Sequence, residues 1–223
     1  MVKDSNPRRG VGLSTATIVA LAIRLADDEG LDALTMRRLA TELSVTPMAL
    51  YWHFTDKNAL LEAMAEHAVE GIFVADATDA PWQDRLRAAL TSTLTVLAAH
   101  PWLTTMRRRV IRSPNYLRVI ETLLDIMRTA GYDDRQAVIA LDMVLDNVAQ
   151  LATRISTAPT SPSADNSTAE TRAQLRALAA AGYPRIAAAA EPLTTPDDPT
   201  AADLIIDVLV RGLDANTPQP DRD

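Results

Sequence analysis

Apolar residues recur at helical spacing along almost the whole chain of 223 residues. The run at 133–155 is the most regular, because its apolar side chains alternate spacings of three and four: Val138, Leu141, Leu145, Val148, Ala152 and Ile155. Such spacing places them on one side of a helix that packs lengthwise on a partner. No strand pattern or internal repeat stands out, so the sequence predicts an all-α fold.

Composition narrows the classes of protein that this chain can belong to. With 48% hydrophobic residues, the chain can bury a substantial core, either as one domain or as two small ones. It has no cysteine, which excludes disulfides and thiolate metal sites. The start of the sequence lacks the apolar stretch of a signal peptide, and no later run is as long as a membrane span requires. We therefore expect a soluble cytoplasmic protein.

The charge is distributed unevenly along the chain. Residues 1–57 hold seven basic and seven acidic side chains, whereas residues 58–223 hold 15 basic and 22 acidic ones and so carry the whole net charge of -7. A neutral N-terminal segment with Arg8, Arg9, Arg37, Arg38 and Lys57 can still present a basic face to phosphates. The overall acidity thus does not exclude a nucleic-acid partner.

Three short helices are predicted near the N-terminus. Ser14 can cap the first, which Gly30 ends, and the second follows Thr35. Thr46 is suited to cap the third, since Pro47 then occupies the first helical position, where its missing N–H costs nothing. A tight turn joins the second and third helices, so the pattern predicts a helix-turn-helix, whose last helix enters the DNA major groove.

Four ring-bearing residues stand together at 51–54, in a chain with only 4% aromatic residues. Leu50 and Phe54 are four apart and should pack inward, and we expect Trp52 in the core as well. The remaining side chains are expected to face the groove and its phosphates: Thr46, Pro47, Met48, Tyr51 and His53. Lys57, at the start of the next helix, adds an ammonium group for a phosphate.

The rest of the chain is predicted as further helices. A helix runs from Asp56 to about Ala75, prolines then separate several helical segments, and a last helix covers 201–213. The polar, proline-bearing stretch 156–168 is expected to be a mobile loop. We expect a flexible arm at 1–13, a DNA-binding domain at 14–57, a ligand-binding and dimerisation domain at 58–214, and a flexible tail at 215–223.

The stretch "LTMRRLATELSVTPMALYWHFTDKNALLEAM" resembles the DNA-binding signature of the tetracycline-repressor (TetR) family. Its "LYWH", followed four residues later by a lysine, is similar to the tetracycline repressors themselves. The resemblance implies an all-helical homodimer with three N-terminal helices on DNA. It also implies a larger helical body that binds a small molecule and then releases the operator.

Position in the motif also implies roles for single residues. Base edges are assigned to Arg37, Thr46, Pro47, Met48 and Ala49, and phosphate or backbone contacts to Thr35, Tyr51, His53 and Lys57. Pro47 and Met48 replace a polar residue of the tetracycline repressors. The operator sequence of those repressors is therefore not carried over to this chain.

Two placements remain open for a semi-polar stripe on the long helix. Met143, Asn147, Gln150 and Arg154 lie at helical spacing beside the apolar residues, and they suit either a ligand pocket or a dimer interface. The middle helices supply further pocket candidates: His100, Trp102, Met106, Tyr116 and Met127. We expect the homodimer to form through the helices at 133–155 and 201–213, which would make a four-helix interface.

Two other classes of function are weighed against this reading. An all-helical enzyme for small molecules has little support, because the three histidines lie far apart and there is no cysteine nucleophile or glycine-rich phosphate loop. We therefore expect no catalytic residues, no cofactor and no metal. A DNA-binding protein without a ligand is disfavoured, since the long acidic body is not needed merely to coat DNA.

Tetracycline itself is predicted not to be the effector. The tetracycline repressors, which this chain resembles, bind the drug as a magnesium chelate through two histidines. His100 stands at one place, but Phe73 stands at the other and offers no metal ligand, while His67 lies six residues earlier. We expect a largely apolar or aromatic effector bound without metal.

Tetracycline with magnesium should therefore leave a protein–operator complex intact, which a gel-shift titration can measure. Release of the operator at micromolar drug that a chelator abolishes would contradict this prediction.

Overall fold

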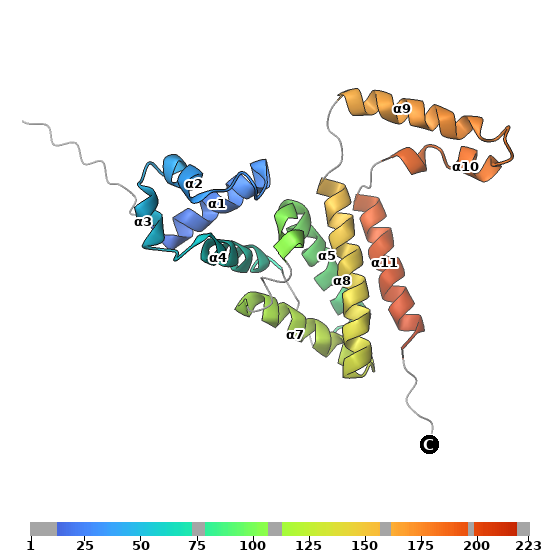
Figure 1. The fold of residues 1–223 in the computed structure, drawn as a ribbon. Coiled ribbons are helices and arrows are strands. Elements are labelled where there is room, and N and C mark those ends of the chain that lie inside the picture. Colours follow the sequence, from blue (N-terminus) through green and yellow to red (C-terminus); the bar gives the residue numbers. More distant parts are fainter. Residues whose placement is uncertain (1–12, 73–78, 107–112, 157–161, 196–198, 218–223) are drawn as a thin grey trace, which may run out of the picture.

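Every regular element in the computed structural model is a helix, which confirms the predicted all-α fold for the described part of the chain (Figure 1). The structure describes residues 13–72, 79–106, 113–156, 162–195 and 199–217. None of the helices within these ranges is long and apolar enough to cross a membrane. Residues 1–12 and 218–223, which hold most of the predicted arm and tail, lie outside them.

An N-terminal bundle consists of α1 (Thr15–Glu29), α2 (Met36–Glu42) and α3 (Pro47–Tyr51). Local sequence explains where each helix begins. Ser14, Thr35 and Thr46 each accept a hydrogen bond from the backbone N–H three residues on, and Pro47 occupies the first turn of α3. The predicted helix starts are therefore confirmed.

The turn between α2 and α3 depends on one residue in a left-handed conformation. Ser44 has a φ of 54°, which is uncommon for a residue other than glycine. Its N–H donates to the Thr41 carbonyl at 3.0 Å, and the Val45 N–H donates to the Ala40 carbonyl at 2.9 Å. These two bonds close α2 and redirect the chain into α3, which completes the helix-turn-helix.

Helix α4 (Lys57–Val69) connects the bundle to the rest of the molecule. The prediction that it continues to about Ala75 is wrong, because the chain leaves the helix after Val69 and residues 73–75 are not among those described. Gly71 explains the stop, since glycine weakens a helix and its Cα lies close to α5. A Cβ atom at Gly71 would lie 3.4 Å from Val96 Cγ2.

The body is built around α5 (Trp82–Ala99). The other body helices are η1 (Pro101–Met106), α7 (Pro114–Thr129), α8 (Asp134–Ser156) and α11 (Pro199–Ala215). Helix α5 packs most extensively on α8 and also contacts α11 and α7, while α4 reaches α7 from the bundle side (Figure 1). The buried side chains of bundle and body form one continuous core.

Helix α8 buries or half-buries five of the six residues that the sequence placed on its packed side, and Val138 is the exception. Leu141, Val148 and Ala152 are buried, as expected of a packed side. Val138, however, is 50% exposed, and Val144 is completely buried instead. The reason is that α5, α7 and α11 all pack on α8 within this chain, so its buried side follows three neighbours rather than one lengthwise partner.

A helical hairpin follows α8 and consists of α9 (Pro162–Ala177), α10 (Pro184–Ala188) and η2 (Pro192–Thr194). The loop predicted at 156–168 is therefore wrong in part. Ser156 still belongs to α8, residues 157–161 are outside the described ranges, and α9 begins at Pro162. Proline is compatible with the first turn of a helix, so the proline-bearing stretch starts a helix. Helix α9 packs on α10 and η2 (Figure 1).

Candidate nucleic-acid interface and ligand cavities

Helix α3 divides its side chains between the core and the surface. Leu50 is completely buried and Phe54 is 6% exposed, whereas Met48 is 67% and Tyr51 is 45% exposed, all as expected. The prediction that Trp52 lies in the core is wrong, because its side chain is 87% exposed. Leu50 and Phe54 already fill the inner face, and Trp52 caps the C-terminal end of α3 on the outside. The surface thus holds one aromatic side chain more than expected.

The outward residues of α3 and its flanks form one surface, which we call the recognition face. It consists of Thr46, Pro47, Met48, Tyr51, Trp52 and His53, which are all exposed, with half-buried Ala49 beside them. The Thr46 hydroxyl accepts a hydrogen bond from the Ala49 N–H, so its own proton is still free to be donated. The His53 Nδ1 lies 3.4 Å from the Thr15 hydroxyl.

Two adjacent arginines on α2 differ in what surrounds them. Arg38 donates hydrogen bonds to Glu42 at 2.9 Å and to Glu29 at 3.0 Å. The hydrogen bond to Glu42, with the charges of both carboxylates, raises the pKa of Arg38. The Arg37 guanidinium is exposed and has no hydrogen bond or ion pair to any described residue. Arg37 is therefore the arginine that can reach DNA without breaking a contact.

The expected phosphate contacts Thr35 and Lys57 also take part in local structure. Thr35 is exposed, and its hydroxyl caps α2 by accepting from the Arg38 N–H at 3.0 Å. Lys57 is half-buried, and its ammonium lies 3.4 Å from the Leu31 carbonyl. A contact of that length is weak, so it does not hold Lys57 firmly inward.

A cavity of about 90 Å³ lies within the body, where α4, α5, α7 and α8 meet. Val69 at the end of α4 and Ile72 just beyond it contribute to the lining, and Tyr116 and Ile120 contribute from α7. Thr93 on α5 adds a hydroxyl to a mainly apolar wall. Of the predicted ligand-binding residues, Tyr116 lines this body cavity.

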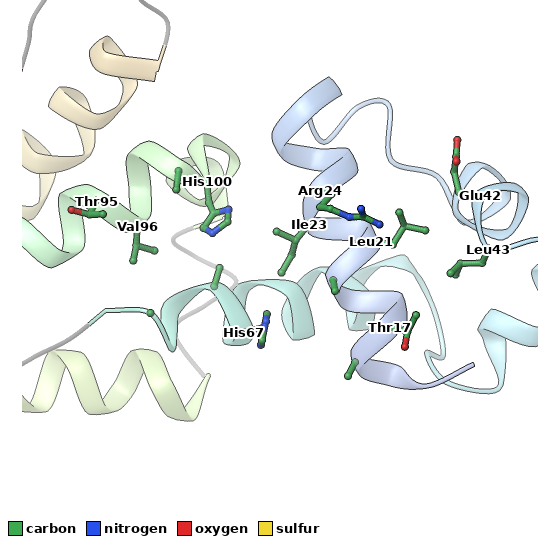
Figure 2. A pocket seen from close by; sticks show the side chains of 15 residues that line it. Thr17, Leu21, Ile23, Arg24, Glu42, Leu43, His67, Thr95, Val96 and His100 are labelled. Carbon is green, nitrogen blue, oxygen red and sulfur yellow. The ribbon is translucent and has the colours of Figure 1, made fainter. Parts of the chain in front are cut away.

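A larger cleft of about 990 Å³ opens between the N-terminal bundle and the body (Figure 2). It lies over α1 and is bounded by the end of α2 on one side and by α4 and α5 on the other. His100, at the end of α5, is the predicted ligand-binding residue that lines this interdomain cleft. No sequence pattern indicated the cleft, because it depends on how two domains meet.

The other predicted ligand-binding residues line neither cavity. Trp102, Met106 and Met127 belong to the core and are 5% exposed or less. Met143, Asn147, Gln150 and Arg154 are exposed on the outer side of α8. The Asn147 amide donates to the Met143 carbonyl at 2.8 Å, so this part of the stripe is bonded along its own helix.

Asp27 on α1 ties the bundle to the body and was missed by sequence reasoning. Its carboxylate accepts hydrogen bonds from the His100 Nδ1 at 2.9 Å and from the Trp102 Nε1 at 2.7 Å. The Asp27 carboxylate thus orients the His100 ring. Among the residues that the structure describes, no group of three His, Asp or Glu side chains is placed to hold a metal ion.

Glu66 on α4 makes a second long-range contact that the sequence did not signal. Its carboxylate accepts from the Ser113 hydroxyl and from the Asn115 N–H, the latter at 3.1 Å. Both donors lie at the N-terminus of α7, where free N–H groups and the helix dipole favour a negative charge. Glu66 therefore joins α4 to α7 beside the body cavity, which both helices line.

Two family models match this chain. One is described as "Bacterial regulatory proteins, tetR family" and matches residues 18–64. The other is described as "Tetracyclin repressor-like, C-terminal domain" and matches residues 75–216. Among curated proteins, the HTH-type transcriptional repressor DrrR1 of Streptomyces coeruleorubidus is 34% identical over 134 residues, which is 59% of this chain and 50% of that protein. The chain spans about half the length of the first curated relatives it matches.

Solved structures with the same fold cover from about two thirds to nearly the whole of this chain. The Streptomyces coelicolor TetR family protein ActR, in complex with actinorhodin, has a TM-score of 0.80 and 26% identity, covering 94% of this chain and 99% of that one. BioQ, solved with its double-stranded DNA operator, has a TM-score of 0.57 and 31% identity, covering 66% of this chain and 89% of that one.

The Asp27 contact should stabilise the junction between bundle and body. In Asp27→Ala, the buried Trp102 indole N–H loses its acceptor, so the free energy of unfolding should fall by about 1 to 3 kcal/mol. Asp28→Ala is the matched control, because Asp28 is its exposed neighbour and should change stability by less than about 0.5 kcal/mol. Urea unfolding measures both, and equal stability of the two variants would refute the contact's role.

Proposed function

The chain belongs to the tetR family of bacterial regulatory proteins, and we propose on this basis that it is a ligand-released transcriptional repressor. In this proposal a homodimer in the cytoplasm binds a near-palindromic operator and leaves it when a small organic effector binds. The observation that carries the proposal is the recognition face, an exposed surface of polar and aromatic side chains on the second helix of a helix-turn-helix.

We assign the DNA contacts by their position on α2, α3 and α4. Pro47 and Met48 are exposed and apolar, so they suit van der Waals contact with thymine methyl groups in the major groove. Arg37 reads a base edge, and Thr46 and Ala49 meet the groove floor. Thr35, Tyr51, His53 and Lys57 meet phosphates and sugars, and Trp52 joins them as an exposed indole.

A dimer face is proposed on the outer sides of α8 and α11, which pack together (Figure 1). Exposed large apolar residues gather there: Val138, Ile139 and Met143 on α8, and Leu204 and Val208 on α11. Exposed apolar residues on two adjacent helices are typical of a covered surface. A twofold axis here gives a four-helix interface and assigns the Met143, Asn147, Gln150 and Arg154 stripe to the dimer rather than to the body cavity.

The body cavity is the proposed effector site. Its volume of about 90 Å³ is below that of ordinary ligand sites, so the effector must enlarge it by displacing the walls. One lining residue, Val69, is the last residue of α4, Ile72 lies three residues beyond it, and α7 is held to α4 through Glu66. Expansion would therefore move α4, which leads directly back to α3. By reciprocity, the operator must weaken effector binding by the same factor.

Related proteins support three parts of the proposal, namely repression, operator binding and ligand binding. DrrR1 is named as a repressor, BioQ was solved on its operator, and ActR was solved with actinorhodin. The apolar wall with the Tyr116 ring agrees with a largely apolar or aromatic effector. No metal takes part in this proposal.

Arg37 and Arg38 provide a matched test of DNA reading. Arg37→Ala should weaken operator binding by about 1 to 3 kcal/mol and relax the preference at one base pair of each half-site. Arg38→Ala removes the same charge from a side chain already bound to Glu29 and Glu42, so the base preference should remain. Footprinting on DNA beside its own gene finds the operator, and fluorescence anisotropy measures affinity. An unchanged base preference in Arg37→Ala would contradict the assignment.

Val208 and Leu117 provide a matched test of the dimer. Val208→Glu places two carboxylates near the proposed twofold axis, so it should convert the dimer to monomers. Leu117→Glu makes the same change on α7, where Leu117 is 50% exposed, and should leave the dimer intact. Sedimentation velocity at equal concentrations distinguishes the two. A Val208→Glu protein that sediments like the original dimer would rule out this face.

A further inference from the structure

The interdomain cleft is the larger of the two cavities by about tenfold, at about 990 Å³ against about 90 Å³. Ligand sites in proteins commonly have volumes of about 300 to 1,000 Å³ and occur preferentially where domains meet. The cleft has both properties in the present conformation. A role for it goes beyond the effector site proposed in the body.

Small residues leave the cleft open. Ala16 and Ala20 of α1 and Ala99 of α5 are exposed along it, and Gly71 follows the end of α4. Larger side chains at these places would fill the space between bundle and body. Leu21, which points toward Leu43, and Val96, on the far side of Ile23 and His100, add apolar surface at opposite ends of the cleft (Figure 2).

Arg24 gives the cleft an uncompensated positive charge. Its guanidinium is exposed on α1 and has no hydrogen bond or ion pair within the described ranges (Figure 2). The carboxylate in the lining, Glu42, already accepts a hydrogen bond from Arg38 at 2.9 Å. His67 and His100 also line the cleft, and the Nδ1 of His100 is bound to Asp27. The lining therefore favours an anion over a cation.

We propose that the interdomain cleft binds a small aromatic organic anion. Its acid group pairs with Arg24, and its ring lies on the apolar lining that α1 and α5 supply. Such a ligand contacts α1 of the bundle and α5 of the body at once. The site is separate from the body cavity, because the two share no lining residue.

A charged and a neutral probe of similar shape test this proposal on the full chain. The probes are 2-naphthoate and 2-naphthylmethanol, with affinity measured from naphthalene fluorescence anisotropy without DNA. Naphthoate should bind with a Kd on the order of 100 µM, as expected for a ligand of about 13 heavy atoms. It should bind about tenfold more tightly than the alcohol, because only naphthoate makes a charge-assisted contact.

Four variants locate the binding. Arg24→Gln should abolish the preference for naphthoate, and Ala99→Phe should abolish binding of both probes by filling the cleft. Arg118→Gln removes an equal charge on α7, and Ala88→Phe adds an equal ring at an exposed position of α5 outside the cleft, so both should behave like the original protein. Circular dichroism melting verifies that each variant is folded.

Three results would overturn the proposal: equal affinity of the two probes for the original protein, a preference that survives in Arg24→Gln, or binding that survives in Ala99→Phe. The proposed repressor function is judged separately, by operator binding of the same variants without probe. A protein that binds no operator would defeat that function while leaving the cleft result unaffected.

Discussion

Burial of α4 on both of its sides is the constraint on which the rest of the molecule depends. Leu60, Met64 and Ala65 are almost completely buried, since α4 packs on α1 in the bundle and on α7 in the body. A helix of 13 residues held at both ends behaves as a rigid rod, so its two ends cannot move independently. In the proposed mechanism, a displacement near Val69 in the body cavity is carried along α4 toward Lys57, where α4 meets the recognition face.

Two carboxylates fix the geometry around this rod, and each joins parts that are far apart in the sequence. Asp27 holds the bundle to the turn after α5, and Glu66 holds α4 to α7. Hydrogen bonds are directional and act over a short range, so they define particular arrangements, whereas apolar contacts tolerate sliding. The junction thus combines apolar contacts, which allow α4 to slide, with two sets of hydrogen bonds, which hold it in a defined position. This combination suits a helix that has two discrete positions.

The sequence could predict whatever depends on near neighbours in the chain. Hydroxyl caps at Ser14, Thr35 and Thr46 act within three residues, and the inward packing of Leu50 and Phe54 follows from helical spacing. Trp52 was misplaced because a helix of five residues has too little periodicity to define its faces. Asp27 and Glu66 gave no signal, since a lone carboxylate on a helix has the same pattern whether its partner is water or a residue 49 or 75 positions away.

The length of α4 explains how a small change in the body can matter at DNA. At about 1.5 Å per residue, its 13 residues span about 20 Å, so a tilt of about 10° moves one end by about 3 Å relative to the other. That displacement equals a whole hydrogen-bond length, which is enough to lose base contacts. In a twofold dimer both recognition faces shift together, and DNA allows little adjustment because half-sites lie about 34 Å apart. Under the proposed function, a cavity that opens by the volume of a small ligand is therefore enough to separate the repressor from its operator, provided that α4 stays rigid.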